Sequence, residues 1–80
     1  MNPEAIILMQ HLGRALARWG EMTTEELSEA MRLSRIRHSA TSLMEARRRM
    51  SGLKLIETIY LPEGNKRYRL TEEGKRSYAT

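Results

Sequence analysis

The chain has 80 residues, no cysteine and a formal net charge of +4, a length that allows one small domain with too little buried surface for an elaborate catalytic cleft. Without cysteine there are no disulfides or thiolate metal sites, and His11 and His38 alone are too few ligands for a structural metal, so we expect neither an enzyme nor a bound metal or cofactor. No apolar run reaches the ~18 residues of a membrane span and no signal-peptide pattern opens the chain, so we expect a cytoplasmic protein without a membrane partner.

The first predicted element is a helix that begins at Pro3, with Asn2 as its cap, and stops at Gly20. Its opposite face, with Ile6, Gly13 and Ala17, is smooth enough for another helix to approach, which predicts either a homodimer seam or the seat of the C-terminal segment. One apolar stripe is expected to face the core, with the tryptophan as its anchor: Ala5, Leu8, Leu12, Ala15, Leu16 and Trp19.

A capping box predicts where the second helix starts. In Thr23-Thr24-Glu25-Glu26 the Thr23 hydroxyl can accept from the backbone three residues on, and Glu26 can accept from the backbone of Thr23. This helix is expected to turn Leu27, Ala30 and Met31 inward and to end near Leu33, which would plug the core beneath a turn.

The third predicted helix starts somewhere between Ser34 and Arg37 and runs to about Met50, with Gly52 as its stop. Arg47 falls within its apolar side, and we expect it to extend its charge into solvent near the helix end rather than to bind DNA. The apolar stripe itself is Ile36, Ala40, Leu43, Met44 and Met50.

Beyond Gly52 the hydrophobic period changes from helical to twofold. Residues 55–61 predict a strand, 62–65 a turn, and 66–70 a second strand with Tyr68 and Leu70 facing the core. Thr71 then caps a last helix from Glu72 to about Tyr78. The predicted fold is α+β and mainly helical, with a three-helix core, a two-stranded hairpin and a short C-terminal helix in a single domain over residues 1–80.

Charge is distributed unevenly along the chain. Residues 1–31 carry two Arg and five Glu, a net charge of −3, whereas residues 32–80 carry twelve Lys or Arg and five Glu, a net charge of +7. A basic half rich in Arg is suited to a polyanion such as DNA, although a charge run can also be a solvated face.

Three segments resemble winged helix-turn-helix regulators. Residues 26–34, ELSEAMRLS, resemble their second helix and turn, Gly52-Leu53 with the following strand resembles the exit from their recognition helix, and residues 68–75, YRLTEEGK, resemble a "Y-x-L-T-x-x-G" ending. That ending is typical of repressors of the multiple-antibiotic-resistance and phenolic-acid-decarboxylase types. The resemblance implies a winged helix-turn-helix that binds duplex DNA and regulates transcription, with a recognition helix in the major groove.

The candidate DNA contacts lie on the third helix and on the hairpin. On the recognition helix the candidates are Arg35, Arg37, His38, Thr41, Ser42, Glu45, Arg48 and Arg49. On the hairpin, or wing, they are Lys66, Arg67 and Arg69, placed for backbone phosphates or a minor groove. Each of these residues is equally compatible with the plain polar side of an amphipathic helix or strand.

Other functions compete with this interpretation. A winged helix can serve as a protein-protein adaptor or subunit without reading DNA, but the third helix is rich in Arg, whereas an adaptor would present a neutral or apolar one. Structured RNA is disfavoured because few aromatic side chains are available to stack on bases. An enzyme is disfavoured because the chain has no nucleophile elbow and no Gly-rich phosphate loop.

Overall fold

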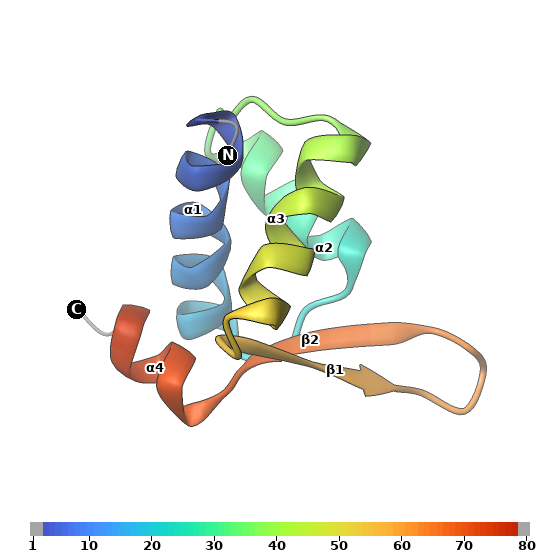
Figure 1. Cartoon of the computed structure of the whole chain (residues 1–80). Helices are drawn as coiled ribbons and strands as arrows, with labels where there is room; N and C mark the ends of the chain where they lie inside the picture. Colours follow the sequence, from blue (N-terminus) through green and yellow to red (C-terminus); the bar gives the residue numbers. More distant parts are fainter. Residues whose placement is uncertain (1–2, 79–80) are drawn as a thin grey trace.

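Three helices pack around one core, and an antiparallel hairpin extends from beneath them to one side (Figure 1). The computed structural model describes residues 3–78, so the predicted cap Asn2 lies outside the described residues. None of the helices in these residues has both the length and the hydrophobicity of a membrane-spanning segment. The predicted α+β, mainly helical class is confirmed by the order of elements: α1 (Pro3–Trp19), α2 (Thr24–Leu33), α3 (Ala40–Gly52), β1 (Ile56–Tyr60), β2 (Lys66–Leu70) and α4 (Glu72–Tyr78).

The core is formed by the apolar faces of the helices and by one side of the hairpin. Spacings of three and four residues bring the buried side chains of each helix onto one stripe. The buried cluster contains Leu8, Leu12 and Leu16 from α1, Met22, Leu27 and Met31 from α2 and the residues before it, Leu43, Ala46 and Met50 from α3, and Ile56, Tyr68 and Leu70 from the hairpin.

Two residues expected in the core lie at the surface instead. Trp19 is 64% exposed, because it ends α1 and the buried side chain of Met22 fills that end of the core. Leu33 is 70% exposed, because the chain turns back after it and Ile36 packs against the core in its place. Neither residue therefore anchors the fold.

The capping box at the start of α2 is confirmed. The Thr23 hydroxyl accepts from the backbone N–H of Glu26 at 3.1 Å, and the Glu26 carboxylate accepts from the backbone N–H of Thr23 at 2.8 Å. These two bonds satisfy backbone donors that the first turn of a helix leaves without a partner.

The recognition helix α3 starts later than predicted, at Ala40. After α2, Arg35 takes a left-handed conformation with φ of 59°, and the N–H of Ile36 donates back to the carbonyl of Met31 at 2.8 Å, a geometry that ends a helix. A second capping box, between Ser39 and Ser42, then starts α3. At its other end Gly52 is the last helical residue, and the left-handed residue is Lys54, with φ of 60°.

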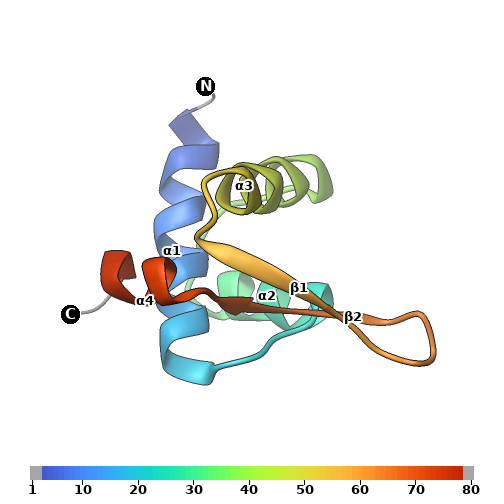
Figure 2. The same ribbon diagram turned by 60° about the horizontal axis from the view of Figure 1, so that its bottom comes forward.

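The hairpin has the predicted alternation. Thr58 lies opposite Tyr68 in the antiparallel register, and Ile56, Tyr68 and Leu70 point into the core. Backbone hydrogen bonds of 2.8 and 3.0 Å between Met22 and Tyr68 attach β2 to the start of α2. The base of the hairpin is thus attached to the helices, while its tip projects beyond them (Figure 2).

Helix α4 is capped as expected and lies close to the chain before β1 through its own Gly74. The Thr71 hydroxyl accepts from the N–H of Gly74 at 3.0 Å and donates to the Lys54 carbonyl at 2.6 Å. A Cβ at Gly74 would lie 1.9 Å from the Leu55 carbonyl oxygen, so only glycine fits at this position of the helix.

Helix α4 also covers part of the smooth face of α1. A Cβ at Gly13 would lie 2.3 Å from the ring of Tyr78, so at this point the face is the seat of the C-terminal segment, as one of the two alternatives predicted. Burial in this contact raises the pKa of the Tyr78 hydroxyl. Ile6 on the same helix is 46% exposed.

Candidate nucleic-acid interface

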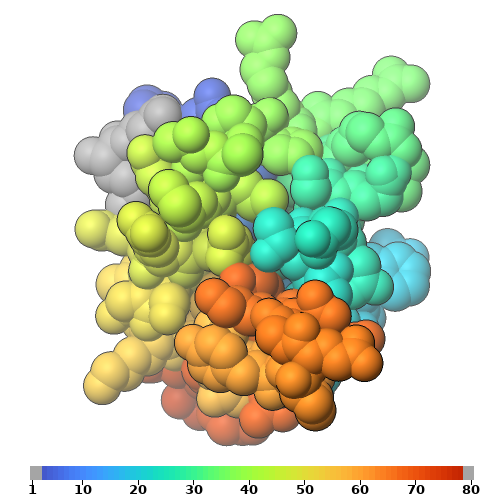
Figure 3. Space-filling model, turned by 90° about the vertical axis from the view of Figure 1, so that its right-hand side faces the viewer, coloured from blue at the N-terminus to red at the C-terminus, as the bar shows by residue number. Residues whose placement is uncertain are grey.

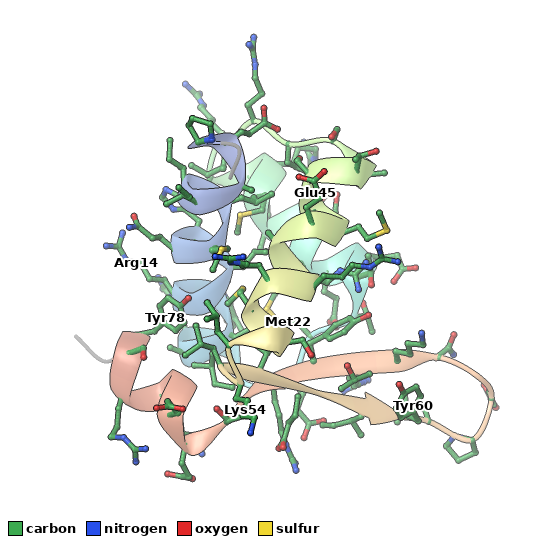
Figure 4. All side chains as sticks on the ribbon, viewed as in Figure 1. Arg14, Met22, Glu45, Lys54, Tyr60 and Tyr78 are labelled. Atoms are coloured by element: carbon green, nitrogen blue, oxygen red, sulfur yellow. The ribbon has the colours of Figure 1, made fainter. Side chains whose placement is uncertain are left out.

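The burial pattern of α3 defines its outer side. Leu43, Ala46 and Met50 are buried, so at 3.6 residues per turn Thr41, Glu45 and Arg48 lie on the opposite side, and all three are exposed. Figure 4 shows Glu45 extending outward from this helix. Three predicted contacts therefore share one exposed helix side.

The predicted apolar stripe of α3 is shifted from the observed one. Ala40 is exposed and Met44 half-buried, whereas Ala46, which the sequence did not single out, is fully buried. Ala46 lies three residues after Leu43 and four before Met50, so it shares their side of the helix, whereas Ala40 is the first residue of α3.

Ser42 cannot serve as a base contact in this arrangement. It is 4% exposed, accepts from the backbone N–H of Ser39 at 2.8 Å, and donates to the Ser39 carbonyl at 3.1 Å. Its hydroxyl closes the first turn of α3. The helical spacing in the sequence did not distinguish this capping residue from its exposed neighbour Thr41, so both were predicted as DNA contacts.

Three other predicted contacts precede the helix. Arg35, Arg37 and His38 lie in the α2–α3 connection, where both arginines are exposed. The His38 ring is half-buried, with Nδ1 3.1 Å from the Ile36 carbonyl and Nε2 2.8 Å from the Ser28 hydroxyl. Because a carbonyl only accepts, Nδ1 donates to Ile36, and in the neutral ring Nε2 then accepts from the Ser28 hydroxyl. His38 thus fastens the connection to α2.

Arg49 lies on the flank of α3 rather than on its outer side. Together with Glu45 and Arg48 it borders a shallow depression whose other wall is Ala5 of α1. This position places it at the edge of the exposed α3 surface, on the side of α1.

The wing residues divide between the two sides of the hairpin. Lys66 shares the helix side with Tyr68, whereas Arg67 and Arg69 point to the opposite side. Arg69 is bound there to Glu57 at 2.5 Å and to Glu21 at 3.7 Å. The hydrogen bond and charge of Glu57 raise the pKa of Arg69, whose guanidinium thus has two acidic partners within the chain.

An exposed tyrosine on the wing was not predicted as a contact. Tyr60 is 74% exposed and pairs with Lys66 across the hairpin, with the Lys66 Nζ 5.7 Å from the ring centroid. It follows the core-facing alternation of Ile56 and Thr58, so the pattern alone would bury it. Its exposure arises because the hairpin extends past the helices at this point (Figure 4).

Arg47 does not extend into solvent as expected. Its guanidinium lies 4.9 Å from the centroid of the Tyr68 ring and its Nη1 donates to the Tyr68 hydroxyl at 2.5 Å. The residue also borders a groove between α2 and the first half of α3, together with Thr24, Ser28 and Met44. Arg47 therefore joins the recognition helix to the wing.

These elements form one continuous face. Figure 3 shows α3, the start of α2 and the wing side by side on the same side of the molecule. The exposed basic residues of this face come from the α2–α3 connection, α3 and the wing, namely Arg35, Arg37, Arg48 and Lys66, while Arg67 lies on the other side of the wing strand. Most acidic residues of the first half of the chain lie on α2 and the segment before it.

Solved structures share this fold. A transcriptional regulator superposes with a TM-score of 0.75 at 19% identity over 89% of this chain and 50% of that chain. A PadR family transcription regulator from Clostridium difficile gives 0.74 at 23% over 88% of this chain and 78% of the other. A winged-helix DNA-binding protein from STIV gives 0.71 at 22% over 91% and 79%.

The chain spans only half the length of the first of these structures. No protein-family model matches the chain, and no curated protein matches its sequence. At these identities the likeness describes the fold alone. The fold expected from the three sequence segments is confirmed: the chain is a winged helix-turn-helix of the kind found in solved transcriptional regulators.

Proposed function

We propose that the protein binds duplex DNA in a sequence-specific manner and regulates transcription, with α3 in the major groove and the wing on the backbone or in a minor groove. One observation carries the proposal. The exposed side of α3 is continuous with the wing (Figure 3), and this face presents four exposed Arg or Lys side chains from the α2–α3 connection, α3 and the wing. A surface of this kind attracts the phosphate backbone while an exposed helix side faces the base edges.

Within this proposal the candidate residues take different roles. Thr41, Glu45 and Arg48 contact base edges, because they share the outer side of α3. Arg35, Arg37, Arg49, Lys66 and Arg67 contact phosphates around that helix. His38, Ser42 and Arg69 hold the frame through their hydrogen bonds and ion pairs within the chain.

The compared structures support a regulator rather than an enzyme, since they are described as transcriptional regulators or as a DNA-binding protein. We propose a cytoplasmic site of action, where such a protein meets its DNA. A homodimer through helix one also remains a proposal. Its surface has to be one other than Gly13, which Tyr78 covers.

Selection from a random duplex pool tests the DNA proposal. We expect enrichment of a defined DNA site. In gel shifts Arg48→Ala should reduce the free energy of binding to that site by about 1 to 3 kcal/mol and affect binding to random duplex much less. The matched control is Arg76→Ala on α4, which removes the same charge from a helix outside this face.

The same assay separates the alternatives. Equal binding of selected and random duplex would show a non-specific basic face. Preference for a structured RNA competitor would show an RNA-binding protein. No binding to any nucleic acid would leave the protein-protein adaptor as the better interpretation.

A further inference from the structure

Met44 lies on the outer side of α3 without belonging to the core. It comes four residues after Ala40, three after Thr41 and four before Arg48, so these side chains are its neighbours along the helix surface. Met44 is half-buried, yet the half-buried apolar side chains of residues 3–78 that pack against the core do not include it. Its burial therefore has another origin.

This burial comes from a groove between α2 and α3, which Met44 lines. Ala40, Leu43 and Met44 make the first half of the α3 wall apolar, while the α2 wall is polar, with side chains such as Glu25 and Ser28. The groove belongs to the face on which α2, α3 and the wing lie side by side (Figure 3). An apolar strip thus lies within the face that is otherwise basic or polar.

Basic side chains border this strip on the same face. Arg37 precedes α3, Arg48 follows Met44 by one turn, and Lys66 lies on the helix side of the wing. Contacts of such residues with phosphates would fix the helix in the major groove with its outer side against the base edges. There an apolar side chain has one apolar partner, the C5-methyl group of thymine.

We propose that Met44, with Ala40 and the methyl group of Thr41 beside it, packs against the C5-methyl group of a thymine. This inference rests on the proposed function, because it requires α3 to lie in the major groove. It adds the identity of a base pair: the DNA site contains a T·A pair at the position that Met44 contacts. The unbranched, polarizable Met side chain is suited to the contact, because it adapts its shape to a small apolar group.

Replacing thymine by deoxyuridine tests the contact, because the change removes only the C5-methyl group and leaves base pairing intact. Each thymine of the selected site is replaced in turn, and gel shifts at one salt concentration give the dissociation constants. We expect one or two thymines at which deoxyuridine weakens binding of the wild-type protein by about three- to tenfold, as for the loss of one buried methyl group.

Variants of Met44 then assign the methyl contact to this side chain. Met44→Ala and Met44→Gln should bind the thymine duplex more weakly and lose most of the difference between thymine and deoxyuridine at that position, as in a double-mutant cycle. Met44→Leu keeps an apolar side chain of similar volume and should keep the difference. Circular dichroism should show all three variants folded, because Met44 lies outside the core.

The matched control is Ile7→Ala on α1. Ile7 is 53% exposed and lies outside the groove, so its loss removes an apolar side chain from another surface. This variant should respond to deoxyuridine as the wild-type protein does.

Three results would overturn the proposal: a selected site without a T·A pair in the segment that α3 covers, wild-type binding that no deoxyuridine weakens, or a deoxyuridine penalty of the wild-type size in Met44→Ala and Met44→Gln. Each of them leaves sequence-specific DNA binding intact and removes only the methyl contact. Failure of the proposed function looks different, since the wild-type protein would then bind no duplex selectively, and this inference would fall with it.

Discussion

Arg47 on α3 lies over the ring of Tyr68 on β2 and donates to its hydroxyl. Tyr68 is in turn bound through its backbone to Met22, directly before α2. One buried tyrosine therefore connects both helices of the helix-turn-helix to the base of the wing. The Nε of Arg47 is buried without a hydrogen-bond partner, so the contact depends on Nη1 and on the ring.

Removing the Tyr68 hydroxyl tests this connection. Tyr68→Phe keeps the ring but leaves the Arg47 Nη1 without its acceptor, which should lower the free energy of unfolding by about 1 to 2 kcal/mol in urea denaturation. Tyr60→Phe is the control, because Tyr60 is 74% exposed and its hydroxyl is free to bond water. Equal effects of the two substitutions would show that Arg47 gains nothing from the hydroxyl.

The cap of α2 contributes to stability and not to base selection. Thr23→Ala removes the acceptor for the N–H of Glu26 and should lower the free energy of unfolding by ~1 kcal/mol, with base preference unchanged. Thr24→Ala, in the first helical position and outside the capping box, should have a smaller effect. A changed base preference without a change in stability would mean that the DNA-reading element lies at α2 instead of α3.

Adjacent residues on α3 should give opposite results. Thr41→Ala should cost ~1 to 3 kcal/mol of binding to a selected site, with a change in stability of less than about 0.5 kcal/mol, because this side chain is exposed. Ser42→Ala should instead lower stability by ~1 kcal/mol through the lost cap. Gel shifts on selected and random duplex, paired with urea denaturation, measure both quantities. The assignment of the outer side fails if Ser42→Ala is the variant that changes specificity.

The two wing arginines should differ in their salt dependence. Arg67→Ala should reduce the slope of log affinity against log salt by about 1, as expected for one lost phosphate contact. Arg69→Ala should change this slope less, because Glu57 and Glu21 already bind the Arg69 guanidinium. Titrations on random duplex at several salt concentrations give the slopes, and identical slopes for the two variants would contradict this distinction.

The seat of α4 on α1 can be tested by a double-mutant cycle. Gly13→Ala should destabilise the wild-type protein by about 1 to 3 kcal/mol, since the new Cβ would lie 2.3 Å from the Tyr78 ring. In a Tyr78→Ala background the same substitution should stabilise by up to about 1 kcal/mol, because alanine favours a helix interior over glycine. Thermal unfolding of the four proteins provides the comparison. The same sign in both backgrounds would show that Tyr78 does not occupy this position in solution.

The sequence by itself determined those features that depend only on residues a few positions apart in the chain. The Thr23 and Glu26 capping box, the alternation that buries Tyr68 and Leu70, and the Thr71 cap each act within a few residues of chain. Local hydrogen bonds and side-chain direction decide these features, so they can be predicted without knowing what packs on them. They predict the order of helices and strands, whereas the winged-helix fold was indicated by the resemblance of three segments to known regulators.

Only the tertiary structure decided which of several similar side chains are buried, which are bonded to other residues of the chain and which are exposed. Trp19 is excluded from the core because Met22, held by β2, fills its place. Ser42 is buried while its neighbour Thr41 is exposed, because Ser42 bonds to Ser39, the cap of α3. Arg47 is drawn onto Tyr68, a partner 21 residues away in the chain. Such contacts join segments distant in sequence, and periodicity within one helix carries no information about them.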